Sequence, residues 1–311
     1  GNEYAPLYQP RRVSQIVPAI ALLTALGLVY LPKFSRWFLV LVLLVYGLSS
    51  VDYWRYKQPW REFVVETAPY LSPGTPLLLE VGGHDYAPRY HYEEALAHSH
   101  DLLLETDEAT AQEVPILGLT TWRQLDPQGY SAGLPPFIQA QNHLWLFYWS
   151  SDTGALDWLD TFGLQRTATF SASFNPDVHL YRYDRLPDES PAQYQNGMIL
   201  RDALLHDSTL VELLWQTETP LSAEYTTSVV LLDESGQVIA QQDSQPFLSQ
   251  RPTSAWQPDE VIYDPKIVQP MPPAGEYRVG VVVYQQINGE VQRILTNNNT
   301  DLLFIGMIRL P

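Results

Sequence analysis

The chain has no cysteine among its 311 residues, which excludes disulfide bonds, thiolate metal sites and cysteine nucleophiles. It is also poor in positive charge, with 18 lysine and arginine residues against 35 aspartate and glutamate residues. Because phosphate backbones are bound by basic surfaces, this balance excludes nucleic acid as a partner. The lack of cysteine leaves the redox compartment open.

The positive charge that is present gathers at one end. Residues 1–58 carry a net charge of +4 and residues 59–311 carry −21. Two uncharged apolar runs, at 16–31 and 37–48, lie in the basic end. With their flanking residues they approach the roughly 17–20 residues that cross a bilayer. The sequence therefore predicts a transmembrane helical hairpin with flanks over 1–58, the alternative being a buried hairpin in a soluble core.

A hairpin places residue 1 and the acidic part of the chain on the same side of the membrane. We expect that side to be the outside, which predicts a multi-pass plasma-membrane protein with extracytoplasmic soluble domains and the lipid bilayer as a partner. The chain begins with glycine rather than methionine, so we also expect a C-terminal piece of a longer protein.

Residues 59–186 alternate between helical and strand patterns, which predicts a Rossmann-like α/β domain. The expected helices are 59–71, 88–97 and 154–162, with a helical turn at 107–113, and the expected strands are 77–81, 101–104, 115–119, 143–149, 167–171 and 178–183. The last two strands are joined by so short a connection that they must be antiparallel.

This predicted domain carries a group of potential metal ligands, namely His84, Asp85, His91, Glu94, His98 and His100. On a helix, His91, Glu94 and His98 would share a face and suit a metal ion. The alternative is a solvated helix face, which we favour because no compact histidine motif of the hydrolase type is present. Gly82-Gly83 follows the first strand and suits a close ligand approach, but the third glycine of a dinucleotide site is missing. We therefore assign neither a metal site nor a nucleotide site.

Residues 187–311 predict an antiparallel β-sandwich of the immunoglobulin-like kind. The expected strands are 198–205, 209–217, 225–232, 238–243, 260–268, 275–285, 293–295 and 302–310. Asn288-Gly289 is typical of a tight hairpin turn between two of these strands.

Several aromatic residues of this second domain suit carbohydrate binding, because flat apolar faces of sugars stack on aromatic rings. They are Trp215, Trp256, Tyr225, Tyr277 and Tyr284, of which Trp215, Trp256 and Tyr284 are the predicted binding residues. The alternative is that they are core and edge aromatics of the sandwich.

Taken in order, several stretches resemble the C-terminal end of bacterial polyprenol-phosphate-dependent membrane glycosyltransferases of family 39, which include protein mannosyltransferases and aminoarabinose transferases. The stretches are Arg11-Arg12, 18–23, 27–28, 56–62, 85–88 with Tyr90 and Tyr92, 214–215, 231–233, 240–243, 252–256 and 275–278. One departure is that Arg11-Arg12 stands where the family has an Arg-Tyr pair.

The resemblance implies an enzyme that transfers a sugar from a polyprenyl-phosphate donor to an extracytoplasmic acceptor through a membrane core. It assigns no catalytic residue and no cofactor to this chain, places a divalent cation only in the full-length enzyme, and makes Arg11 and Arg12 candidates for the lipid phosphate. Interfacial anchoring of the helix by these arginines is the alternative.

Two other functions remain open. One is an envelope protein without enzymatic activity, whose sandwich binds carbohydrate or protein. The other is a metal-dependent hydrolase centred on His84, His91 and Glu94.

Overall fold

The computed structural model describes Pro32 and residues 60–82, 86–96, 99–101, 113–125, 130, 136–151 and 153–311. By its internal contacts the chain divides into residues 1–58 and residues 59–311, and the second unit is one compact body. The predicted hairpin, including Arg11 and Arg12, lies outside the described residues apart from Pro32. The predicted boundary between 59–186 and 187–311 stays a prediction.

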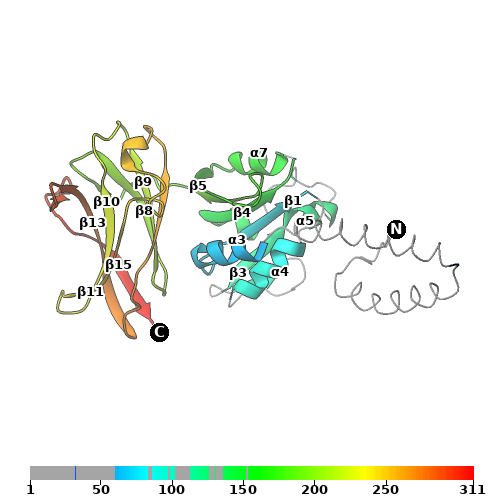
Figure 1. The fold of residues 1–311 in the computed structure, drawn as a ribbon, viewed down its shortest axis with the longest axis horizontal. Coiled ribbons are helices and arrows are strands. Elements are labelled where there is room, and N and C mark those ends of the chain that lie inside the picture. The colour runs from blue at the N-terminus through cyan, green and yellow to red at the C-terminus, as the bar shows by residue number, and fades with distance from the viewer. Residues whose placement is uncertain are drawn as a thin grey trace. The chain divides into compact units, whose positions relative to one another are not determined.

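The first half of the compact body, which we call the mixed-sheet half (residues 60–184), is built on six strands (Figure 1). Its elements are α3 (Trp60–Thr67), β1 (Leu77–Val81), α4 (Tyr86–Ala95), β2 (Ser99–Asp101), β3 (Val114–Gly118), α5 (Leu119–Leu125), α6 (Pro136–Gln139), β4 (His143–Trp149), α7 (Gly154–Asp160), β5 (Gln165–Ser171) and β6 (His179–Asp184). A short 3-10 turn, Ala68–Tyr70, follows α3.

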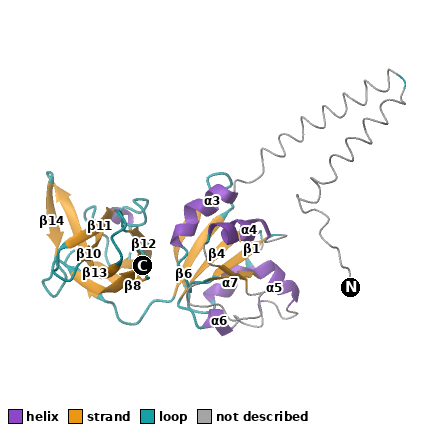
Figure 2. Cartoon of the chain, turned by 90° about the horizontal axis from the view of Figure 1, so that it is seen from below, coloured by secondary structure: helices purple, strands orange, loops and turns teal. Residues whose placement is uncertain are grey.

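The strand order in this sheet is β2-β3-β1-β4-β6-β5. Strands β2, β3, β1 and β4 are parallel, whereas β6 is antiparallel to both β4 and β5. The antiparallel pairing of β5 with β6 was predicted from the sequence. Helices α3 and α4 cover one face and α5 and α7 cover the other (Figure 2). Because both faces are covered, β1 is buried at all five positions, which explains its uninterrupted apolar sequence.

The second half, which we call the sandwich half (residues 192–310), contains two antiparallel sheets. Its strands are β7 (Ala192–Gln193), β8 (Met198–Leu205), β9 (Leu210–Thr217), β10 (Thr226–Leu232), β11 (Val238–Ser244), β12 (Ile262–Ile267), β13 (Gly275–Ile287), β14 (Glu290–Ile294) and β15 (Leu303–Leu310). One sheet has the order β12-β9-β8-β7 and the other β11-β10-β13-β14, with β15 also paired to β13. Asn288 and Gly289 form the tight turn from β13 to β14 with positive φ angles of 52° and 87°.

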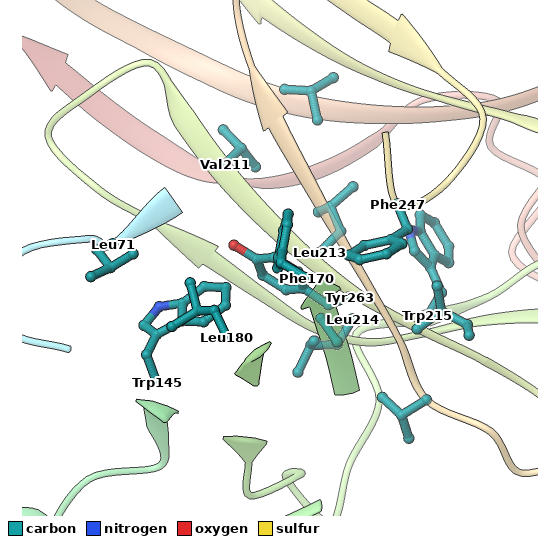
Figure 3. Close-up of a cluster of buried hydrophobic side chains, with 14 of the residues drawn as sticks. Leu71, Trp145, Phe170, Leu180, Val211, Leu213, Leu214, Trp215, Phe247 and Tyr263 are labelled. Atoms are coloured by element: carbon teal, nitrogen blue, oxygen red, sulfur yellow. The ribbon is translucent and has the colours of Figure 1, made fainter. Parts of the chain in front are cut away.

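Strand β9 of the four-stranded sheet is buried on both faces. Leu213 and Trp215 of β9 face the core between the two antiparallel sheets, whereas Glu212 contacts the mixed-sheet half. Tyr263 of β12 likewise packs edge-on against Trp145 of β4, with ring centroids 5.6 Å apart. Figure 3 shows Leu213, Trp215, Trp145 and Tyr263 in the shared hydrophobic cluster. The double coverage explains why all eight residues of β9 are buried.

These findings correct the predicted fold class. The described part of the chain is mainly β-sheet, and no helix within it is both long and apolar enough to span a membrane. The Rossmann-like assignment is wrong in topology, because the Rossmann order would place the second strand between the first and the third. Here β3 lies beside β1, and β2 forms the edge. Sequence periodicity identifies strands but does not say which strands are neighbours.

Candidate functional site

A hollow lies at the carboxyl end of β1 and β4. We call it the edge pocket; its volume is about 560 Å³. It is lined by Gly82, Tyr148, Trp149, Ser150, Ser151, Asp177, His179 and Tyr181. Strand β1 is followed by a connection to one side of the sheet and β4 by a connection to the other side. Ligands of open α/β sheets bind at such reversals, outside the carboxyl ends of the strands.

Strand pairing brings the pocket residues together from three separate segments. The parallel ladder of β1 and β4 continues to its end, where the Gly82 amide donates to the Trp149 carbonyl over 2.8 Å. Because β6 runs antiparallel to β4, it begins where β4 ends, and His179 lies directly opposite Tyr148. Asp177 stands just before β6, in the turn where its amide donates to the Asn175 side chain over 3.0 Å.

Aromatic rings form one side of the edge pocket. The His179 and Tyr181 rings are stacked with centroids 5.2 Å apart, and the Tyr148 ring lies 5.8 Å from that of Tyr181. Tyr148 and Tyr181 are only 7% and 6% exposed, whereas His179 is half-buried. The Arg166 guanidinium lies over the Tyr181 ring at 5.0 Å and fixes its position.

The polar groups of the pocket have distinct electrostatic roles. Burial and the nearby Arg166 lower the pKa of His179, while Asp177 raises it less strongly, so the imidazole is neutral at pH 7. The His179 Nδ1 atom bonds to the Ser171 hydroxyl at 3.0 Å, which leaves Nε2 for a ligand. Asp177 is exposed and contributes acceptor oxygens at the rim. The arrangement offers donors and acceptors beside rings, which is what binding a polyhydroxylated ligand requires.

The predicted metal ligands are only partly described. His91 and Glu94 approach to 3.9 Å on α4, and burial lowers the pKa of His91. His84, Asp85 and His98 lie outside the described residues, and His100 is described only in its backbone, in β2. Among the side chains that the structure describes, no group of three metal-ligating residues is found.

The predicted carbohydrate platform needs correction. Trp215 and Trp256 are 0% and 1% exposed, and their indole nitrogens donate to the Asp264 carboxylate and the Arg251 carbonyl, each over 3.2 Å. Rings this deeply buried cannot stack on a sugar. Tyr225 and Tyr277 are buried as well, and of the five aromatics only Tyr284 is half-exposed. The alternative, that these aromatics belong to the core, therefore describes Trp215 and Trp256.

Sequence reasoning missed the edge pocket except for Gly82, which the Gly-Gly pair had marked as a place for close ligand approach. The predicted strand 143–149 could have located the pocket. Once this strand is placed beside strand 77–81, Ser150 and Ser151 must lie next to Gly82. Sequence reasoning also missed Glu80 of β1. Its carboxylate is 1% exposed and accepts hydrogen bonds from Arg123 at 2.6 Å and Tyr130 at 2.8 Å.

No family model and no curated protein matches this chain. Solved structures that resemble part of it include a glycosyl hydrolase family 2 member from Bacteroides cellulosilyticus, at 11% identity over 38% of this chain and 15% of that one, with a TM-score of 0.19. A β-glucuronidase from Ruminococcus gnavus in complex with uronic deoxynojirimycin matches at 12% identity over 45% of this chain and 22% of its own, with a TM-score of 0.18. The chain therefore spans less than a quarter of the length of these structures, and scores this low support no conclusion about activity.

The predicted membrane-spanning character is corrected for the described part of the chain. No helix there is long and apolar enough to cross a membrane. The family 39 resemblance, its polyprenyl-phosphate donor and its divalent cation stay predictions from the sequence. The bilayer contact and the role of Arg11 and Arg12 also stay predictions, because residues 1–58 lie outside the described residues apart from Pro32.

Proposed function

We propose that the compact body formed by residues 59–311 binds carbohydrate in the edge pocket. The observation that carries this proposal is the placement of the stacked His179 and Tyr181 rings beside Asp177 and two serines, at the reversal point of the sheet. The half-buried His179 ring, held in place by Tyr181, suits the apolar face of a sugar, and the carboxylate and hydroxyl groups suit its hydroxyls.

The charge of the pocket restricts the class of sugar that can bind there. Asp177 is the acidic group at its rim, and the surrounding 59–311 segment carries a net charge of −21. An anionic sugar would be repelled by this field, whereas a neutral sugar or an amino sugar would not. We therefore expect uronic-acid oligosaccharides to bind the edge pocket least well.

Two pocket variants, Asp177→Asn and His179→Ala, should weaken sugar binding. A hydrogen bond to a charged group contributes about 1.5–3 kcal/mol, so Asp177→Asn should weaken it by about 10- to 100-fold. His179→Ala should weaken it as well, because it removes the half-buried ring of the wall. Isothermal titration of the full chain with neutral, amino-sugar and uronic-acid oligosaccharides measures the effect.

Glu218→Gln is the matched control for Asp177→Asn, because Glu218 is an exposed carboxylate in a loop of the sandwich half and does not line the edge pocket. It removes the same charge and should leave binding unchanged. Binding that both pocket variants retain, or the lack of binding by any oligosaccharide in the panel, would rule out the proposal.

We also propose that the compact body lies outside the cytoplasm. This proposal rests on the large acidic excess of residues 59–311. The cytoplasmic face of the membrane is the anionic one and would repel such an acidic body. A reporter enzyme that is active on only one side of the membrane, fused after Pro311, tests it. Activity of a cytoplasm-specific reporter would contradict it.

A further inference from the structure

A second hollow, of about 290 Å³, lies on the sandwich half, between the β7 segment and the loop that leads into β15. We call it the amide cleft and define it by Gln193, Thr296, Asn297, Asn298, Thr300 and Phe304. Pro191, Ala192, Leu302 and Leu303 complete the lining. The amide cleft shares no residue with the edge pocket, so a ligand can bind in one of them whether or not the other is occupied.

The loop that carries the amides is held rigidly. The Thr296 amide donates to the Thr300 carbonyl over 2.8 Å, and the hydroxyls of the same two residues lie 2.8 Å apart. The Asn297 amide donates to the Gln193 backbone carbonyl over 2.8 Å, which ties the loop to the β7 segment. The cleft is therefore preorganised, and a ligand does not have to order it.

One side-chain contact arranges the polar groups for a ligand. The Asn297 side-chain nitrogen donates to the Gln193 side-chain oxygen over 3.0 Å. This bond leaves the Asn297 oxygen able to accept a bond and the Gln193 amide nitrogen able to donate one. Two neighbouring hydroxyls of a sugar ring supply the matching donor and acceptor, since each hydroxyl performs both roles.

An exposed ring completes the cleft. Phe304 is 50% exposed, and the Arg278 guanidinium lies over its ring at 4.2 Å. A phenylalanine side chain exposed to this degree loses unfavourable contact with water when a ligand covers it. The cleft thus combines an apolar ring with a strip of amides, and none of its lining residues is ionisable.

We infer that the amide cleft is a binding site for a neutral saccharide, in which an apolar sugar face packs on Phe304 and vicinal hydroxyls bond to the Gln193–Asn297 pair. Since the ligand is neutral and none of the lining residues is ionisable, neither salt nor pH between about 5 and 9 should change the affinity. The edge pocket, with Asp177 and His179, differs from the amide cleft in that respect.

The test uses the full chain, with neutral hexasaccharides of glucose, mannose and galactose as the probes. Asn297→Ala and Phe304→Ala should each weaken binding by about tenfold or more, the effect of losing one hydrogen bond or one stacking partner. The dissociation constant of this site should be the same at about 0.05 M and about 0.5 M NaCl. Melting temperatures equal to that of the unchanged chain confirm that the variants fold.

Two matched variants serve as controls. Gln237→Ala removes an exposed amide in the turn before β11, and Met307→Ala removes a 61% exposed apolar side chain of β15. Both should leave binding unchanged. If no hexasaccharide binds, or if neither cleft variant weakens binding, the inference is overturned. Weakening in Asp177→Asn alone would place all binding in the edge pocket.

Discussion

Replacing Arg182 with methionine lowers the free energy of unfolding by about 3–5 kcal/mol at pH 7, because it leaves two buried carboxylates without their cation. Arg182 is fully buried in β6 and bonds to Asp184 and to Glu212 of β9, each at 2.9 Å. Its guanidinium also lies 5.1 Å from the Trp145 ring and 5.2 Å from the Tyr263 ring. Urea unfolding of the full chain measures the loss.

The same substitution has a characteristic pH dependence. Burial by itself would raise the pKa of Asp184, but Arg182 and the bonds from His143 and Thr167 outweigh it, so the pKa is lowered. The pKa of Glu212 is lowered for the same reason, mainly by Arg182 and His206 acting against burial. Lowered carboxylate pKa values give stability that is present above the unfolded values and is lost as pH falls through the folded values.

Without Arg182, burial raises both carboxylate pKa values, and the variant then gains stability as pH falls. The difference in unfolding free energy between the two proteins should therefore shrink below about pH 5. A difference that stays constant down to about pH 3.5 would contradict this. Arg309→Met is the control, since the Arg309–Glu276 pair is 74% and 52% exposed and should change stability by less than about 1 kcal/mol.

The second large effect is expected for Asp264→Ala in β12. The Asp264 carboxylate accepts bonds from Thr227 at 2.6 Å, from Trp215 at 3.2 Å and from the Phe247 amide at 3.1 Å, and it pairs with Lys266 at 3.0 Å. Removing it leaves these buried donors unpaired, so we expect a loss of about 3–5 kcal/mol in unfolding free energy. Chemical denaturation of the full chain measures it.

A double variant separates the charge from the other bonds. Burial raises the pKa of Asp264 and lowers that of Lys266, so each charge is costly without the other. Adding Lys266→Met to Asp264→Ala removes the unpaired ammonium and should recover part of the loss. If the loss of unfolding free energy in the double variant equals the sum of the losses in the two single variants, Asp264 and Lys266 are not coupled.

The turn after β11 depends on the same carboxylate. Phe247, Leu248 and Ser249 all have positive φ angles, between 52° and 66°, which non-glycine residues adopt at a cost. The Asp264 bond to the Phe247 amide and the packing of the Phe247 ring on Phe170, with centroids 5.1 Å apart, hold this turn in place. We therefore expect Asp264→Ala to loosen the contact between the two halves as well.

The sequence predicted individual elements better than their arrangement. Alternating apolar residues marked strands such as β10 and β13, and the short connection before His179 required β5 and β6 to be antiparallel. Helix α5 was missed because its first residues, Leu119 onwards, continue the apolar run of β3. The exchanged positions of β2 and β3 carry no local signal at all.

The sites were harder to predict for a related reason. The edge pocket joins residue 82 with residues 148–151 and 177–181, and only the strand pairings bring these together. Trp215 and Trp256 were predicted to bind sugar because composition shows that an aromatic is present but not which way its ring faces. Phe304 was overlooked although it is half-exposed, because its strand resembles a core strand.

The ion pair between Arg182 and Glu212 also bears on how the compact body unfolds. Arg182 belongs to the mixed-sheet half and Glu212 to the sandwich half, and both side chains are fully buried. If the mixed-sheet half melted first, Glu212 would lose its guanidinium partner, and if the sandwich half melted first, Arg182 would keep only Asp184. Forms in which only one half is unfolded are therefore destabilised. Residues 59–311 should melt in one cooperative transition although they contain three sheets.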